Sequence, residues 1–166
     1  MKTKGMFFLL AISAGSAVAI AATPPPAAKP AMKPAATGKV CKLEISGTDA
    51  MQFDKKELAI AADCKVVQLT LKHSGKLPIS AMGHNWVLTK TADVMPVNNA
   101  GLTAGLAKNH VPPGDKRVIA FTPVVGGGQS TNISFPTTGL VKGGDYTFFC
   151  SFPGHIGLMR GKFTVQ

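Results

Sequence analysis

The feature that most constrains the fold is a short loop near the carboxyl end, Cys-Ser-Phe-Pro-Gly-His-Ile-Gly-Leu-Met, from Cys150 to Met159. It places a thiol, the imidazole of His155 and a thioether within ten residues of one another. Soft sulfur ligands combined with imidazole favour copper, and two histidines, one cysteine and a weak axial methionine are typical of electron-transfer copper sites. The second histidine has to come from elsewhere, and His84 is the candidate. The fold must therefore bring residue 84 beside this loop.

From Val40 onward, short segments in which apolar and polar residues alternate are separated by turn residues. Residues 91–108 are the only stretch that favours helix, and Pro96 makes this helix short or irregular. This pattern predicts an all-β fold, a Greek-key sandwich or barrel of about eight strands with one short helix. The expected strands cover residues 40–45, 51–53, 65–73, 85–89, 116–122, 131–135, 144–150 and 161–166.

The amino end predicts export and a domain boundary. Residues 1–21 combine two lysines, an apolar run and small residues at a cleavage site, which indicates a signal peptide rather than a transmembrane segment. Residues 22–39 are rich in Pro, Ala and Lys and predict an extended, disordered tether. The folded domain is then expected at 40–166, and the periplasm is the expected compartment.

The net charge is +10, from 18 Lys and Arg against 8 Asp and Glu. A nucleic-acid partner is not expected, because Arg117 and Arg160 are the only arginines and no nucleic-acid motif occurs. The charge is mostly lysine and favours long-range attraction of an acidic partner. A weak contact between the lysines of the tether and an anionic membrane surface is a further possibility.

Three cysteines leave one thiol unpaired in an oxidising compartment. Cys41 and Cys64 are able to close a loop worth roughly 3 kcal/mol in the chain-entropy model. Cys150 is then the odd one, and a thiolate that binds metal is protected from oxidation. The other two pairings remain open at this point.

Several motifs together resemble the azurins, the bacterial blue copper proteins of the cupredoxin family. They are Met-Gly-His-Asn-Trp-Val-Leu at 82–88, Cys-Ser-Phe-Pro-Gly-His at 150–155, Leu-Met at 158–159, Met-Gln-Phe at 51–53, Arg-Val-Ile-Ala at 117–120 and Tyr-Thr-Phe-Phe-Cys at 146–150. The resemblance runs over roughly residues 40–166. It implies one type 1 copper ion held by His84, Cys150 and His155, with Met159 and the carbonyl of Gly83 at longer axial distances.

The resemblance also implies roles for residues around the ligands. Asn85 is expected to tie the two ligand segments together and to donate a hydrogen bond near the cysteine sulfur, and the backbone N–H of Phe152 to point at the same sulfur. An apolar docking patch is expected from Met82, Leu102, Pro153 and Gly154. The family disulfide maps to Cys41 and Cys64. His73 matches a family histidine near the site, whereas His110 has no counterpart and is expected on the surface.

These features predict a periplasmic electron carrier whose copper cycles between Cu(II) and Cu(I) without substrate turnover. Its partners are expected to be redox proteins, a cytochrome c, a dehydrogenase or a reductase, with an acidic docking surface. The alternative is a periplasmic copper storage or chaperone protein, although such proteins typically use clustered, exchangeable ligands. An enzyme is the weakest interpretation, because a copper oxidase needs a second metal centre and more histidines than the sequence offers.

Overall fold

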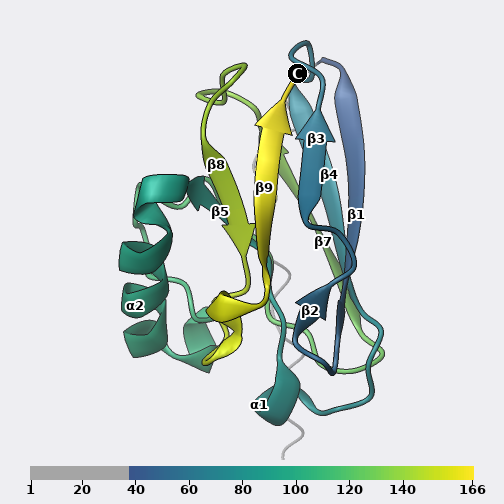
Figure 1. Ribbon diagram of the computed structural model, residues 1–166, viewed down its shortest axis with the longest axis vertical. Helices are drawn as coiled ribbons and strands as arrows, with labels where there is room; N and C mark the ends of the chain where they lie inside the picture. Colours follow the sequence, from purple (N-terminus) through teal and green to yellow (C-terminus); the bar gives the residue numbers. More distant parts are fainter. Residues whose placement is uncertain (1–37) are drawn as a thin grey trace, which may run out of the picture. The chain divides into compact units, whose positions relative to one another are not determined.

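The computed structural model describes residues 38–166, which form two β-sheets packed against each other (Figure 1). The first sheet has the order β2-β1-β4-β7, made of β1 (Val40–Thr48), β2 (Gln52–Phe53), β4 (Val66–His73) and β7 (Ser130–Pro136). The second has the order β3-β9-β8-β5-β6, made of β3 (Glu57–Ile60), β5 (Val87–Lys90), β6 (Ala120–Phe121), β8 (Tyr146–Phe149) and β9 (Arg160–Val165).

Helical structure is confined to the connections between strands. The helices are α1 (Ile79–Met82) and α2 (Val94–Ala104), with 3₁₀ turns η1 (Thr91–Asp93), η2 (Leu106–Lys108) and η3 (His155–Gly157). The expected all-β fold with one short helical segment at 91–108 is therefore confirmed. The expected signal peptide (1–21) and almost all of the expected tether (22–39) lie outside the described residues.

The main core lies between the two sheets, because strand residues alternate between the inner face and solvent. In β4, Leu69 and Leu71 are fully buried, whereas Gln68 before them and Lys72 after them are exposed. Trp86 is also fully buried, and its ring lies 5.9 Å from that of Phe135 and 6.1 Å from that of Phe148. This aromatic packing makes the body of the domain rigid.

A second apolar cluster lies on the outer face of the second sheet. Val94 and Val97 of α2 pack there with Val87 of β5 and Phe149 of β8. Strand β5 is consequently buried on both faces, with Val87 toward α2 and Leu88 toward the main core. Pro96 is accommodated within the first turn of α2, where a missing backbone N–H costs no helical hydrogen bond.

The structure differs from the sequence expectation in two strands. β3 was not expected, since it is only four residues long and follows two exposed lysines. The strand expected at 116–122 shrinks to Ala120–Phe121. The Asp115 carboxylate accepts hydrogen bonds from the backbone N–H and side chain of Arg117, so this segment forms a turn instead.

Two of the strand pairs are parallel, β1 with β4 and β3 with β9, and the other pairs are antiparallel. The parallel pairing of β1 and β4 arises because the chain between them crosses to the second sheet as β3 and returns. As a result β1 and β4 both start at one end of the sandwich and finish at the other. They pair in register from Val40 with Val66 to Gly47 with His73.

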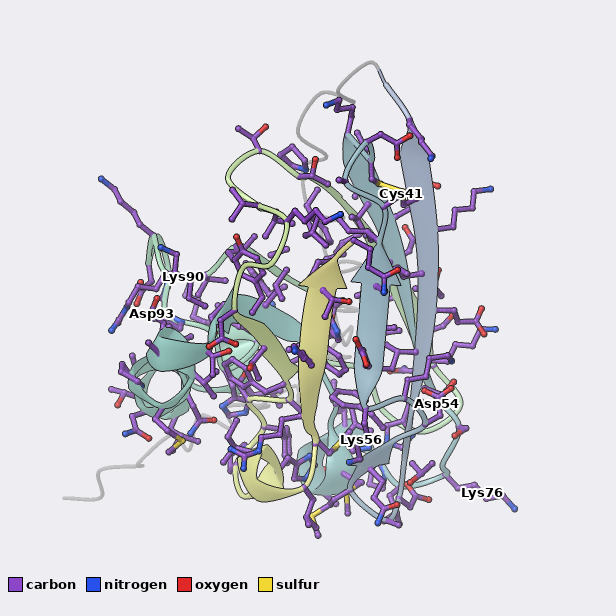
Figure 2. All side chains as sticks on the ribbon, turned by 45° about the horizontal axis from the view of Figure 1, so that its top comes forward. Cys41, Asp54, Lys56, Lys76, Lys90 and Asp93 are labelled. Carbon is purple, nitrogen blue, oxygen red and sulfur yellow. A yellow bond between two sulfur atoms is a disulfide. The ribbon has the colours of Figure 1, made fainter. Side chains whose placement is uncertain are left out.

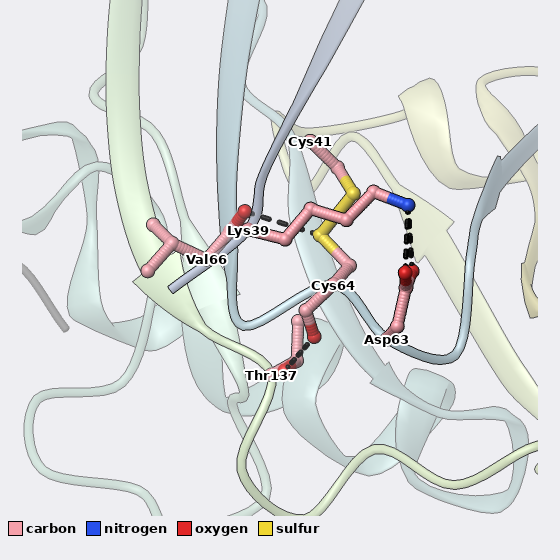
Figure 3. The surroundings of a disulfide bond; sticks show 6 residues. All are labelled: Lys39, Cys41, Asp63, Cys64, Val66 and Thr137. Atoms are coloured by element: carbon pink, nitrogen blue, oxygen red, sulfur yellow. Dashed lines mark hydrogen bonds and ion pairs between the residues drawn. A yellow bond between two sulfur atoms is a disulfide. The ribbon is translucent and has the colours of Figure 1, made fainter. Parts of the chain in front are cut away.

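The disulfide between Cys41 and Cys64 joins these two strands where they start (Figure 3). Around it, the Nζ of Lys39 lies 2.8 Å from the Asp63 carboxylate, and Thr137 Oγ1 donates to the carbonyl of Cys64 over 2.6 Å. The far end of β1, at Thr48, contacts His84: the Nε2 of His84 donates to the carbonyl of Thr48 over 2.9 Å. The disulfide and His84 therefore mark opposite ends of the sandwich, the disulfide end and the metal end.

Candidate metal centre

Three potential metal ligands meet at the metal end. The ligand atoms of His84, Cys150 and His155 all lie within 4.8 Å of one another, and all three side chains are buried. The Nδ1 atoms of the two histidines are 3.3 Å apart, and the Cys150 sulfur lies 3.6 Å from His155 Nδ1. The fold thus joins a residue near the middle of the chain to the carboxyl-terminal loop, as the sequence required.

His84 is fixed in orientation by its surroundings. It follows α1 and Gly83, and its backbone exchanges hydrogen bonds with Val125 in an isolated bridge. Because Nε2 carries the proton donated to Thr48, Nδ1 keeps its lone pair and faces the other two ligand atoms. A Cβ on Gly83 would lie within 2.7 Å of both Ile79 and Phe152, so only glycine fits beside this histidine.

Cys150 and His155 are held by the closed loop between β8 and β9. The backbone N–H of Cys150 donates to the carbonyl of Met159, and that of Met159 donates to the carbonyl of His155. Gly154 adopts φ 83°, a left-handed conformation that glycine takes without steric cost. The loop therefore folds back on itself and directs its thiol and imidazole inward.

Met159 and Gly83 lie beside these three residues. Met159 is fully buried, and a Cβ built on Gly47 would lie 3.2 Å from its Cε and 2.6 Å from His84 Cδ2. Gly47 thus lets β1 approach both side chains closely. The carbonyl of Gly83 lies against the imidazole of His84, where it opposes the lowering of that group's pKa.

Asn85 connects the two ligand segments. Its Oδ1 accepts from the backbone N–H of Ser151 over 2.8 Å, and its Nδ2 donates to Ser151 Oγ over 2.8 Å and to the carbonyl of Asn109 over 2.7 Å. The hydrogen bonds toward the Cys150 sulfur come from the backbone N–H groups of Asn85 and Phe152. The side chain of Asn85 therefore binds Ser151 and Asn109, while its backbone N–H faces the sulfur.

The two remaining histidines differ from each other. The ring of His73 stacks on His84 at 4.2 Å, and its Nε2 donates to the carbonyl of Met82 over 2.8 Å. His110 was expected on the surface, but it is only 7% exposed. Its ring packs edge-on against Phe152 at 5.3 Å, and Phe152 in turn lies 4.8 Å from the ring of His155. The left-handed backbone at Asn109 and His110 turns this imidazole inward.

Burial changes the protonation of the candidate ligands. It raises the pKa of the Cys150 thiol from 9.0 to about 12, against the opposing effect of the N–H groups of Asn85 and Phe152. It lowers the pKa of His155 from 6.5 to about 4, helped by the repulsion that His84 and His73 exert when they are protonated. It also lowers the pKa of His84. Without metal the thiol is protonated and both imidazoles are neutral at pH 7, so metal binding must displace the thiol proton.

The metal-free protein is therefore expected to be most stable between about pH 6.5 and pH 9. Below pH 6.5 the unfolded chain protonates His155 more readily than the folded chain, so the free energy of unfolding falls toward pH 4. Above pH 9 the unfolded chain loses the Cys150 proton first, so stability falls again toward pH 12. Urea unfolding of the metal-free protein between pH 5 and pH 11 measures both slopes.

The variant Cys150→Ser is the control for this experiment. It removes the thiol, so its stability should stay level above pH 9 to the extent that Cys150 causes the alkaline decline. Equal alkaline slopes for the parent and the variant would contradict the assignment of this titration to Cys150.

The residues expected to form a docking patch surround the edge of this centre. Leu102, Pro153 and Gly154 are exposed, and Met82 is partly exposed. Gly101 touches the carbonyl of His110, and His110 packs on Phe152, which places Leu102 at the metal end. The structure thus brings the two halves of the expected patch to the same end of the domain.

Sequence reasoning did not identify Gly47, Thr48, Ser151 or Asn109. Thr48 orients His84, Gly47 makes room for it, and the other two residues are the partners of Asn85. None carries a ligand atom, and three of them act through backbone groups. The one indication in the sequence was Gly47, a glycine two residues beyond the first expected strand (40–45).

The chemistry of the donor set determines which metal it can hold. Two imidazole nitrogens and a sulfur face one another in a buried space. Among the described residues, no carboxylate joins this group. Hard, oxygen-seeking cations such as Mg²⁺ and Ca²⁺ are disfavoured by such ligands, whereas copper is favoured by them. The residues present therefore fit one copper ion.

Comparisons with known proteins agree with this chemistry. Residues 39–166 match the family described as copper binding proteins, plastocyanin/azurin family. The chain is 54% identical over 121 residues to azurin from Bordetella pertussis, covering 73% of this chain and 81% of that protein. It is 47% identical over 126 residues to azurin from Pseudomonas fluorescens biotype C, covering 76% and 98%. A solved azurin (Az-iso2) from Methylomonas sp. strain J is similar in structure, with a TM-score of 0.73, 43% identity and coverage of 76% and 98%.

Proposed function

The chain belongs to the plastocyanin/azurin family of copper binding proteins and is a blue copper electron carrier, not an enzyme, and we propose that His84, Cys150 and His155 hold its single copper ion. The observation that supports this ligand set is the meeting of their three ligand atoms within 4.8 Å. Met159 and the carbonyl of Gly83 are proposed as the weak axial ligands, because both lie beside His84.

When bound, copper supplies a one-electron Cu(II)/Cu(I) couple. The protein's residues keep the donors in place before and after the electron moves. Thr48 fixes the imidazole of His84, and the closed loop from Cys150 to Met159 fixes the other donors. The N–H groups of Asn85 and Phe152 stabilise negative charge on the sulfur, which supports the thiolate that forms when the metal displaces the thiol proton. A rigid, buried donor set lowers the rearrangement that each electron transfer requires.

Redox proteins are the partners of such a carrier. We propose that a cytochrome c, a dehydrogenase or a reductase with an acidic surface docks at Met82, Leu102, Pro153 and Gly154. Two of these residues, Pro153 and Gly154, are exposed and directly precede His155 in the ligand loop. The excess of lysine favours an acidic partner, since opposite charges speed association.

We also propose that residues 1–21 direct export to the periplasm, on the pattern of lysines, apolar run and small residues that the sequence carries. Across residues 38–166, no helix has the length and apolar character needed to cross a membrane.

The test of the proposed function is the visible spectrum of the mature protein after addition of Cu(II), followed by ascorbate. An intense blue absorption that bleaches on reduction and returns on oxidation is the expected result. Bound copper with a pale spectrum would contradict the proposal and would favour storage or transport of copper instead.

A further inference from the structure

The apolar surface at the metal end extends beyond the four residues already described. Leu77, Leu102, Leu106 and Leu158 are each between 39% and 52% exposed, although large apolar side chains usually avoid solvent. Leu77 precedes α1 and accepts a hydrogen bond from the N–H of Gly127, while Leu158 directly precedes Met159. Exposed apolar side chains gathered at one end of a soluble domain mark an interaction surface.

A cation accompanies each part of this surface. Lys76 precedes Leu77, Lys108 ends the η2 turn that Leu106 begins, and Arg160 follows Met159. Lys56 directly precedes β3, and its Nζ donates to the carbonyl of Leu158 over 2.9 Å. All four cationic side chains are exposed. Figure 2 shows Lys56 and Lys76 at the same end of the domain, away from Cys41.

The carboxylates near these cations are already engaged within the domain. Asp49 accepts hydrogen bonds from the backbone N–H groups of Lys76 and Leu77. Asp54 accepts from the backbone N–H of Ser46 and pairs with Lys55 over 2.7 Å. Within residues 38–166, none of Lys56, Lys76, Lys108 and Arg160 is paired with a carboxylate. The metal end therefore presents apolar residues bordered by cations whose charge is not neutralised locally.

From this arrangement we propose that Lys56, Lys76, Lys108 and Arg160 form a basic rim that orients an acidic redox protein on the metal end. The proposal rests on the proposed electron-carrier function and adds the residues that recognise the partner. The complementary partner carries an apolar patch surrounded by Asp and Glu. Charges at the rim of an interface chiefly change the association rate, while the apolar centre supplies contact area.

The test compares two variants with the same net charge. The rim variant is Lys56→Gln, Lys76→Gln, Lys108→Gln, and the control is Lys42→Gln, Lys65→Gln, Lys142→Gln. The control lysines belong to segments at the disulfide end, next to Cys41, Cys64 and the loop that bonds to Val165. Each variant loses three positive charges, so the part of any difference between them that salt removes reports where the charge lies. Arg160 stays unchanged because it adjoins Met159.

Reduced plant-type ferredoxin, an acidic iron–sulfur protein with a low potential, is the probe. One electron leaves its [2Fe–2S] cluster and reduces Cu(II) to Cu(I), and stopped-flow absorbance follows the loss of blue colour. At low ionic strength the rim variant is expected to react at least about tenfold more slowly than the parent, and the control less than about threefold. The difference should disappear near 1 M salt, where screening is nearly complete.

Binding provides a readout that does not depend on electron transfer. Oxidised ferredoxin is titrated into the ¹⁵N-labelled Cu(I) protein, and amide shifts are expected around Leu77, Leu106 and Leu158. Equal slowing of the two variants, or shifts centred on Cys41, would overturn the basic rim. If copper gave no blue colour in any of the proteins, the proposed function would be wrong instead, so the two failures are distinguishable.

Discussion

Replacing Cys150 by Ser is expected to abolish the intense visible absorption of the copper-loaded protein. The intensity of such a band comes from charge transfer between a thiolate sulfur and copper, and Cys150 is the one free cysteine of the described residues. A serine hydroxyl is a hard, weakly acidic ligand and does not replace a thiolate on copper. Absorption spectroscopy with Cu(II) measures the loss directly.

The matched control removes the other two cysteines, through Cys41→Ser with Cys64→Ser. This variant should keep the blue absorption, because the disulfide lies at the end of β1 and β4 away from His84. It should lose about 3 kcal/mol of stability, the value for opening a loop of this length in the chain-entropy model. A full blue band in Cys150→Ser would overturn the ligand assignment.

Asn85→Leu is expected to have the second largest effect. The substitution removes three hydrogen bonds and leaves the backbone N–H of Ser151 and the carbonyl of Asn109 without their partner. Each buried polar group left unpaired costs about 1–3 kcal/mol, so a loss on the order of 3–5 kcal/mol is expected in urea unfolding of the metal-free protein. The copper absorption should also shift, because the two ligand segments are no longer tied together.

Ser151→Ala provides the comparison. It removes the hydroxyl that accepts from Asn85 but keeps the backbone N–H that donates to Asn85 Oδ1. A loss of about 1 kcal/mol is expected for this single hydrogen bond. If both variants lost the same small amount, the Asn85 network would not hold the ligand segments together.

The ligand loop was predictable because its chemistry is local. Cys150, His155 and Met159 lie within ten residues, and the glycines and proline between them indicate a loop. The strands β1, β4 and β7 were likewise predictable, because apolar and polar residues alternate along each of them with the two-residue period of a strand. His84 required more, since its place beside the loop depends on the complete fold, and the resemblance to the azurins supplied that link.

The parts that sequence reasoning missed depend on tertiary contacts. β3 is short and gains its place by pairing with β9, which follows it by about one hundred residues in the chain. His110 has the polarity of a surface residue, but the left-handed turn at Asn109 directs its ring against Phe152. Ser151 and Asn109 become important through backbone atoms, which every residue possesses and which no sequence pattern distinguishes.

The positions of the two ends of residues 38–166 determine how this carrier can be attached to a solid surface such as an electrode. Gly38 adjoins the start of β1, and Gln166 bonds to Ile60 and Ala62 near Cys64, so both ends of the described chain lie at the disulfide end (Figure 1). The length of β1 alone separates that end from His84 by nearly 30 Å. A domain attached to an electrode directly at Gly38 or Gln166 would turn its copper away from the electrode. Electrons would then have to pass through a soluble mediator at the opposite face. Direct electron transfer to the electrode would require an attachment point introduced beside Leu102 or Leu158.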